Sequence, residues 1–139
     1  MNQNSTHSGH SMAALAERVM ELDIEKEINQ VTELGLAWTE LHEQASLLEE
    51  TRKTFLAQLI AEIMSASRKD GGRGISFAQA ENEARADVRY EAYLREMTKA
   101  RKEANQAKVR HETAGVRLEM LRSLMANRRE EMRLAGFQR

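Results

Sequence analysis

Residues 67–81 read SRKDGGRGISFAQAE, and this stretch decides whether the chain reverses direction or continues as one long helix. It holds three of the chain's seven glycines, and glycine adopts the backbone angles that end a helix more readily than other residues do. Ser76 and Gln79 have the spacing of a capping box, in which two side chains satisfy backbone donors at a helix start. Ile75 precedes the cap, where an apolar residue often fixes the entry of the chain. We therefore predict that one helix ends here and a second begins.

Apolar residues on both sides of this bend recur with the alternating spacing of three and four that marks a coiled-coil seam. The first seam, interrupted at Arg52, consists of Ile24, Val31, Leu34, Trp38, Leu41, Ala45, Leu48, Phe55 and Leu59. The second, interrupted at Arg128, consists of Tyr90, Tyr93, Met97, Ala100, Ala104, Ala107, His111, Ala114, Leu118, Leu121, Met125, Met132 and Ala135. In an antiparallel hairpin, residue i faces roughly residue 145 − i. This pairing sets large against small side chains, with Trp38 and Leu41 opposite Ala107 and Ala104, and Phe55 opposite Tyr90.

These patterns predict an all-α protein, a long antiparallel helical hairpin with helices over about 12–68 and 76–135 and a loop over 69–75. The composition agrees, because the chain has no proline and 31% charged residues, with helix-forming residues dominant. Residues 1–10 are polar and are expected to be disordered, and Ser11 would cap the helix at Met12. Residues 11–139 are then one domain.

A two-helix hairpin would leave part of the apolar surface exposed to solvent. Leu56, Ile60 and Ile63 widen the first stripe near the bend, so more than one neighbour is expected to pack there. One antiparallel partner leaves several residues partly uncovered, namely Leu56, Ile60, Leu94, Val109 and Leu124. We therefore expect a homo-oligomer; the alternative is a monomer in which Met12 to Leu22 folds back as a short extra N-terminal helix. Gly35 and Gly115 predict a kink or a close helix crossing.

Several classes of site are disfavoured. The glycine cluster lacks the Gly-Lys-Ser/Thr sequence and the preceding strand of a phosphate-binding P-loop. Without cysteine the chain has no thiolate ligand or nucleophile. The four histidines, His7, His10, His42 and His111, form no metal-binding motif, and a polar residue in a seam more often fixes register. We expect no catalytic residues, no cofactor and no metal. No signal peptide or membrane-spanning segment is recognisable in the sequence.

The distribution of charge suggests an anionic partner. Residues 1–68 carry 5 basic and 11 acidic side chains, whereas residues 85–139 carry 14 basic and 8 acidic ones. Basic residues converge near the bend, where phosphates could be neutralised and the aromatic ring of Phe77 could stack on an unpaired base. The candidate nucleic-acid-binding residues are Arg52, Lys53, Arg68, Lys69, Arg73, Phe77, Arg85 and Arg89. A second basic run contains Lys99, Arg101, Lys102, Lys108, Arg110, Arg117 and Arg122. The alternative is that these cations pair with the acidic first helix.

An acidic first helix, the connector SRKDGGRGIS and a second long helix ending in MRLAG together resemble the UvsY-type recombination mediators of tailed phages. The likeness covers roughly residues 24–136 and is one of length and element order. It implies a non-enzymatic, all-helical ring that binds single-stranded DNA. It also implies contacts with a strand-exchange recombinase and a single-strand-binding protein, the first of which replaces the second. Lys69 and Arg73 best match the family's basic positions at this bend. The alanine-rich second seam departs from the family. The implied location is the cytoplasm, that of the host if the gene is carried by a phage.

A second hypothesis stays open. The same hairpin could serve as a protein-interaction module, such as a phage inhibitor of a host defence nuclease or a small assembly chaperone. Steep loss of DNA affinity with salt would favour the first hypothesis.

Overall fold

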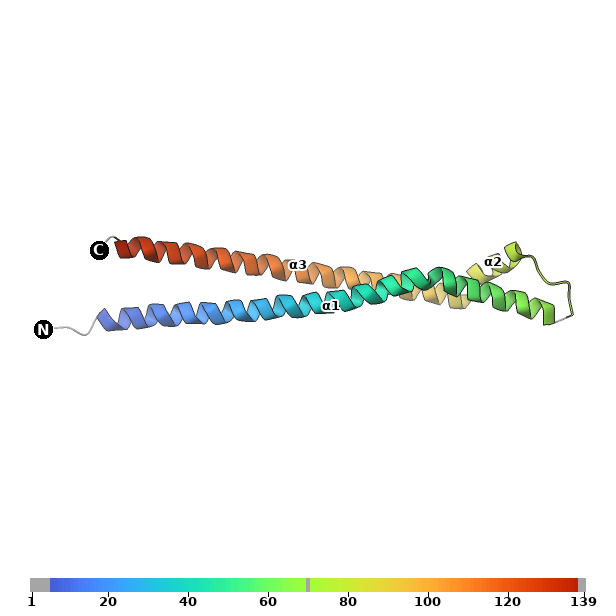
Figure 1. The fold of residues 1–139 in the computed structure, drawn as a ribbon, viewed down its shortest axis with the longest axis horizontal. Coiled ribbons are helices and arrows are strands. Elements are labelled where there is room, and N and C mark those ends of the chain that lie inside the picture. Colours follow the sequence, from blue (N-terminus) through green and yellow to red (C-terminus); the bar gives the residue numbers. More distant parts are fainter. Residues whose placement is uncertain (1–5, 70, 138–139) are drawn as a thin grey trace. The chain divides into compact units, whose positions relative to one another are not determined.

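The computed structural model describes residues 6–69 and 71–137. Three helices make up nearly all of this part of the chain, α1 (Thr6–Lys69), α2 (Phe77–Ala86) and α3 (Val88–Phe137), and neither range contains a strand (Figure 1). The all-α class is the one that the sequence predicts, and the long first and third helices pack together. None of these helices has an apolar stretch long enough to cross a bilayer.

The start of α1 differs from the sequence expectation. The helix begins at Thr6 rather than at Met12, so Ser11 lies inside it and does not cap it. Extending an existing helix adds one hydrogen bond for each residue fixed, which costs far less than nucleating a new one. The remainder of the expected tail, residues 1–5, lies outside the described residues. Met12 to Leu22 is part of α1 and does not form the separate helix considered as an alternative.

The described residues form two compact units. Unit 1 contains residues 6–36 and 108–137, and unit 2 contains Ala37–Ala107. Each unit therefore combines a part of α1 with a part of α3, and α2 belongs to unit 2. In both units the two parts run antiparallel. Thr51 contacts Tyr93 in unit 2 and Val31 contacts His111 in unit 1, close to the predicted pairing.

Unit 2 has a hydrophobic core to which all three helices contribute. Leu59 and Ile60 from α1, Ala80 and Ala84 from α2, and Tyr90 from α3 are buried together. Partly buried hydrophobic residues surround this core, namely Phe55, Leu56, Ile63, Met64, Ile75 and Leu94. The widened stripe near the bend thus has the second neighbour that the sequence predicted, and this neighbour is α2.

The second helix that the sequence predicts is broken at Asp87. This residue is extended (φ −65°, ψ 134°), and its backbone N–H donates to the carbonyl of Ala84, which ends α2. Its carboxylate accepts from the backbone N–H of Arg89 at 2.8 Å, and its carbonyl accepts from Glu91 at 3.1 Å, which starts α3. An aspartate is among the best helix N-caps. The break gives α2 a direction of its own, with Ala80 and Ala84 facing the core.

The seam of unit 2 follows the predicted register, with one pair corrected. Ala45, Ala104 and Ala107 are at most 4% exposed, as expected for the small residues of the seam. Phe55 stacks on Tyr93, with ring centroids 4.7 Å apart, rather than lying opposite Tyr90. The reason is that Tyr93 is anchored to α1, since its hydroxyl donates to the carbonyl of Leu48. Tyr90 instead joins the three-helix core.

Unit 1 contains both glycines for which a kink or close crossing was predicted, and they differ. A Cβ atom on Gly35 would lie 2.9 Å from Cε1 of His111, so α1 and the imidazole approach as closely as glycine allows. His111 also donates from Nδ1 to the carbonyl of Val31 at 3.1 Å. A Cβ atom on Gly115 would meet nothing within 4 Å. Neither glycine interrupts its helix. Of the two predicted features, the close approach is present at Gly35 and absent at Gly115.

Candidate nucleic-acid interface

The last turns of α1 are strongly basic. Residues 51–69 contain four basic side chains and a single acidic one, Glu62. Glu62 accepts from Nη1 of Arg89 at 2.7 Å, so an α3 residue neutralises it. In the described part of the chain, Arg52, Lys53, Arg68 and Lys69 have neither an ion pair nor a side-chain hydrogen bond. The positive charge of this segment is therefore available to an anionic partner.

The connection after α1 is held in place by local contacts. Gly71 has a φ of +73°, and its N–H donates to the carbonyl of Arg68 at 3.4 Å, which ends the helix. The hydroxyl of Ser67 donates to the carbonyl of Met64 and accepts from the backbone N–H of Ile75 at 3.4 Å. Ile75 in turn packs against the core of unit 2. Both ends of the connection are thus fixed, and Arg73 between them is exposed.

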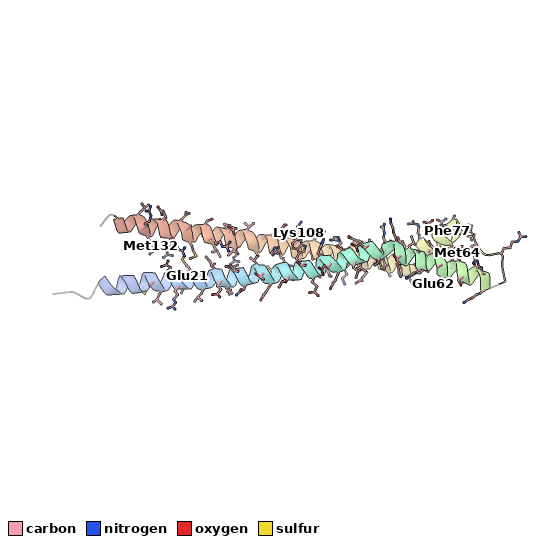
Figure 2. All side chains as sticks on the ribbon, viewed as in Figure 1. Glu21, Glu62, Met64, Phe77, Lys108 and Met132 are labelled. Atoms are coloured by element: carbon pink, nitrogen blue, oxygen red, sulfur yellow. The ribbon has the colours of Figure 1, made fainter. Side chains whose placement is uncertain are left out.

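The start of α2 presents an aromatic ring to solvent. Ser76 is the N-cap, and its hydroxyl accepts from the backbone N–H of Gln79 at 3.2 Å. The capping box is half formed, because the Gln79 side chain donates to Glu83 instead of returning to Ser76. Phe77, the first residue of α2, is 60% exposed (Figure 2). A ring held at a capped helix start can stack on a base with little loss of freedom.

Two of the eight candidate residues are already paired within the chain. Arg85 donates to Glu81 at 2.9 Å, and this hydrogen bond raises the pKa of the Arg85 guanidinium. Arg89 donates to Asp87 and to Glu62, hydrogen bonds that raise the pKa of Arg89. The same contact with Arg89 lowers the pKa of Asp87. Arg85 and Arg89 therefore have a structural role, and a phosphate would have to compete with carboxylates for them.

Arg52 and Lys53 are separated from the bend. From Lys53 to Lys69 the rise along α1 is roughly 24 Å at 1.5 Å per residue. These two residues therefore do not join the group at the bend, although sequence reasoning placed them there. The candidate group at the bend consists of Arg68 and Lys69 at the end of α1, Arg73 in the connection, and Phe77 at the start of α2. A shallow surface hollow lined by Ala61, Met64, Ser65, Arg68 and Lys69 extends from it along α1.

Some residues of the second basic run form ion pairs with acidic residues of α1. In unit 2, Arg101 donates to both carboxylate oxygens of Glu49 (2.7 and 2.8 Å) and also contacts His42 and Ser46. The hydrogen bond from Arg101 lowers the pKa of Glu49. In unit 1, Arg117 pairs with Glu27 at 3.3 Å. The alternative interpretation of the charge asymmetry, pairing with the acidic first helix, therefore accounts for these arginines.

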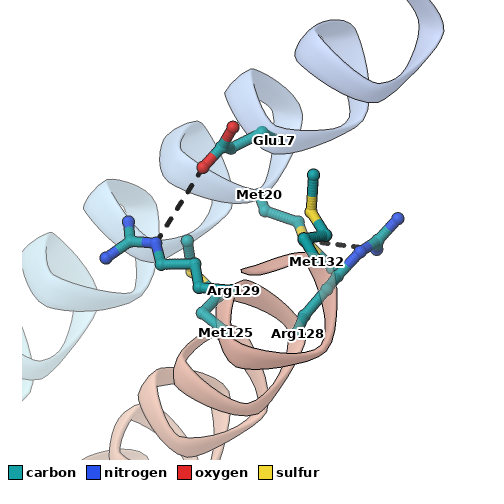
Figure 3. A pocket seen from close by; sticks show the side chains of 6 residues that line it. All are labelled: Glu17, Met20, Met125, Arg128, Arg129 and Met132. Carbon is teal, nitrogen blue, oxygen red and sulfur yellow. Dashed lines mark hydrogen bonds and ion pairs between the residues drawn. The ribbon is translucent and has the colours of Figure 1, made fainter. Parts of the chain in front are cut away.

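In unit 1, a small pocket lies between residues 17–20 of α1 and residues 125–132 of α3 and is lined mainly by methionine and arginine (Figure 3). Arg128, where the predicted heptad is interrupted, lies with Nη1 3.5 Å from the sulfur of Met20. Arg129 contacts Glu17 at 3.9 Å, the ion pair drawn as a dashed line in Figure 3. The chain thus fills this level of the seam with long flexible side chains, which pack less tightly than the alanines of unit 2.

The two histidines whose side chains the structure describes, His42 and His111, belong to different units. His42 contacts Arg101 in unit 2 and His111 contacts Val31 in unit 1, while the side chains of His7 and His10 lie outside what the structure describes. In the described part of the chain, no three His, Asp or Glu side chains are grouped in a way that would hold a metal ion.

Comparisons of the chain with protein-family models, with curated proteins and with solved structures found no match.

Proposed function

We propose that the protein is a non-enzymatic, helical DNA-binding protein that holds single-stranded DNA at the bend between α1 and α2. The observation that carries this proposal is the absence of acidic partners for Arg68, Lys69 and Arg73 within the described residues. Several arginines elsewhere in the chain do pair with nearby carboxylates, as at Arg101 and Arg117. Exposed cations without such partners release more counterions when they bind phosphate.

Each residue of the group has a distinct part in the proposed binding. Arg68, Lys69 and Arg73 contact phosphates, and Arg68 is steadied because its aliphatic stem lies against Gly74. Phe77, which is 60% exposed, stacks on an unpaired base. Phosphate contact and stacking carry little sequence information, so binding should be tolerant of base sequence.

The resemblance to UvsY-type mediators suggests what such binding is for. A mediator helps to load a strand-exchange recombinase onto DNA that is coated with single-strand-binding protein. We extend the proposal to this role, with the recombinase and the single-strand-binding protein as partners. A protein that holds the strand mainly by its phosphates, with one base stacked on Phe77, leaves the other bases accessible to a recombinase.

Fluorescence anisotropy with a labelled single-stranded oligonucleotide tests the binding itself. The logarithm of the affinity should fall linearly with the logarithm of salt concentration, with a slope of about −0.7 for each phosphate contact. Three phosphate contacts predict a slope of about −2. An absence of binding at low salt would eliminate the DNA-binding proposal.

The site is tested by the charge-reversed double variant Lys69→Glu/Arg73→Glu. We expect it to weaken binding to all sequences alike and to make the salt slope shallower by more than one, because two phosphate contacts are lost. The matched control is Lys99→Glu/Lys102→Glu, which changes the net charge equally at two exposed lysines of α3 in unit 2. Equal weakening by both variants would show that overall charge rather than the bend governs binding.

A protein-interaction module, such as an inhibitor of a defence nuclease or an assembly chaperone, is the second candidate. The exposed hydrophobic side chains of unit 1, among them Val116 and Met120, favour a protein partner. The two candidates differ in the DNA titration, since the interaction module predicts no binding to the oligonucleotide at low salt.

A further inference from the structure

A row of exposed hydrophobic side chains follows one face of α3 in unit 1. Val109, Val116, Met120, Leu124 and Leu134 are 53–62% exposed. Their spacing places them on one side of the helix, opposite the seam in which Ala114 and Leu118 are buried. A shallow hollow follows the same face. We call these five residues the outer stripe of α3. Single exposed hydrophobics are ordinary, but Val116, Met120 and Leu124 follow one another at spacings of four and line the hollow together, which indicates a contact surface.

We infer that the outer stripe binds the outer stripe of a second copy of the chain, with the two α3 helices antiparallel about a two-fold axis between residues 121 and 122. This arrangement sets Val109 opposite Leu134 of the second copy and brings the two Met120 side chains together near the axis. The contact extends over roughly 38 Å of helix, more than three heptads, which is a common length for a coiled coil. The interface is self-complementary, as two-fold symmetry requires.

The charges beside the stripe select this arrangement. Beside the seam, about two residues from the directly opposed level, Arg110 lies next to Glu131 of the second copy, and two-fold symmetry repeats this contact. On the other side of the seam Glu112 lies next to Arg133 of the second copy, although within their own chain these two residues already pair with Lys108 and Glu130. Arg110 and Glu131 have no ion pair within the described residues of their own chain. Two exposed charges of opposite sign that lack internal partners thus meet across the proposed axis.

Other pairings of the two stripes fit less well. If one helix slides by one heptad so that the axis lies at residue 118, Arg117 lies beside Arg117 of the second copy. Glu119 likewise lies beside Glu119 of the second copy, and like charges repel. If the helix slides by one heptad in the other direction, Val109 extends past Phe137, the end of α3 in the second copy, and has no residue of that helix opposite it. A parallel pair sets Glu130 against Glu130 of the second copy and gives neither Arg110 nor Glu131 an oppositely charged neighbour.

The first experiment measures the mass of the full chain by sedimentation equilibrium over a range of concentrations. We expect a dimer that Met120→Glu dissociates, raising the dissociation constant at least about tenfold, because two carboxylates would meet near the axis. The matched control is Leu22→Glu, since Leu22 and Met120 are both 62% exposed but Leu22 lies on α1. Leu, Met and Glu have similar helix propensities, so helix content should stay constant. A monomeric wild type, or a dimer insensitive to Met120→Glu, would overturn the inference.

A charge exchange tests the direction and register of the pairing. Arg110→Glu alone and Glu131→Arg alone should each raise the dissociation constant about fivefold at low salt, because each creates two contacts between like charges. The double variant Arg110→Glu/Glu131→Arg should restore it to within about twofold. Parallel and heptad-shifted dimers do not bring residues 110 and 131 together, so failure of the double variant to restore the affinity rejects the proposed arrangement.

Discussion

The two units use the same pair of helices to different effect. Eight of the ten buried hydrophobic side chains in the described residues belong to unit 2, and Ala114 and Leu118 belong to unit 1. Twelve of the fifteen exposed large hydrophobic side chains belong to unit 1. The ion pairs between helices follow the same division. They are 2.7 Å long at Arg101–Glu49 and Arg89–Glu62 in unit 2 but 3.3–4.0 Å long at the arginines of unit 1.

The difference follows from the number of helices that each unit contains. Two antiparallel helices bury one stripe each, and any further apolar residue stays exposed. Unit 2 adds α2, which covers Ile60 and the neighbouring residues that one partner would leave open. Unit 1 has no third helix within the described residues, so its outer stripe remains exposed. A second copy of the chain would supply in unit 1 what α2 supplies in unit 2.

The largest expected effect is on the core of unit 2. Leu59 is 2% exposed within the three-helix core, so Leu59→Ala should lower the free energy of unfolding by about 2–5 kcal/mol. Leu118→Ala in unit 1 should cost less, because a two-helix seam can close over the cavity more easily. Urea unfolding followed by far-ultraviolet circular dichroism measures the loss of helix in both units.

The control for this pair is Leu47→Ala, since Leu47 is 60% exposed and its truncation should change stability little. All variants are compared at one protein concentration, because association would add to the apparent stability. A cost for Leu118→Ala equal to that of Leu59→Ala would show that the core is not concentrated in unit 2.

Sequence reasoning predicts the helices and their seam well, because heptad spacing and glycine placement are local properties. It misses the break at Asp87, although the residue has the character of an N-cap, because the apolar pattern of the second seam starts just beyond it at Tyr90. The partner of Phe55 is also missed. Tyr90 and Tyr93 lie about one helical turn apart, so the seam pattern does not separate them as partners of Phe55. The contact of the Tyr93 hydroxyl with Leu48 decides between them and is not visible in the sequence.

The candidate site is predicted less completely than the fold. The pairing of Arg85 with Glu81 is visible as a spacing of four residues on a helix. The pairing of Arg89 with Glu62 depends on tertiary structure, since the two residues are 27 positions apart. The network of Arg101 with His42, Ser46 and Glu49 was missed for the same reason. Which cations stay unpaired is therefore decided by the packing of the helices.

Replacing the two glycines of unit 1 by alanine should change the free energy of unfolding by a smaller amount, and the two replacements should differ from each other. Gly115→Ala should raise the free energy of unfolding by about 0.5–1 kcal/mol, because alanine favours the helix and its Cβ meets nothing within 4 Å. Gly35→Ala should give no such gain, since its Cβ displaces His111 and strains the hydrogen bond to Val31. Thermal unfolding followed by circular dichroism measures both. A stabilising Gly35→Ala would show that the imidazole moves freely.

The smallest effect concerns the ion pair of Glu49 and Arg101 in unit 2. Because Arg101 lowers the pKa of Glu49 in the folded state, the pair stabilises the fold above the usual carboxyl pKa of about 4.3. That contribution is lost as the pH falls through the lowered pKa of the folded state. Glu49→Gln should therefore flatten the loss of stability in acid, whereas Glu50→Gln, at an exposed neighbour without an ion pair in the described residues, should not. Urea unfolding across this pH range measures the difference. An unchanged acid profile in Glu49→Gln would mean that the tight ion pair of unit 2 is no more stabilising than the long ones of unit 1.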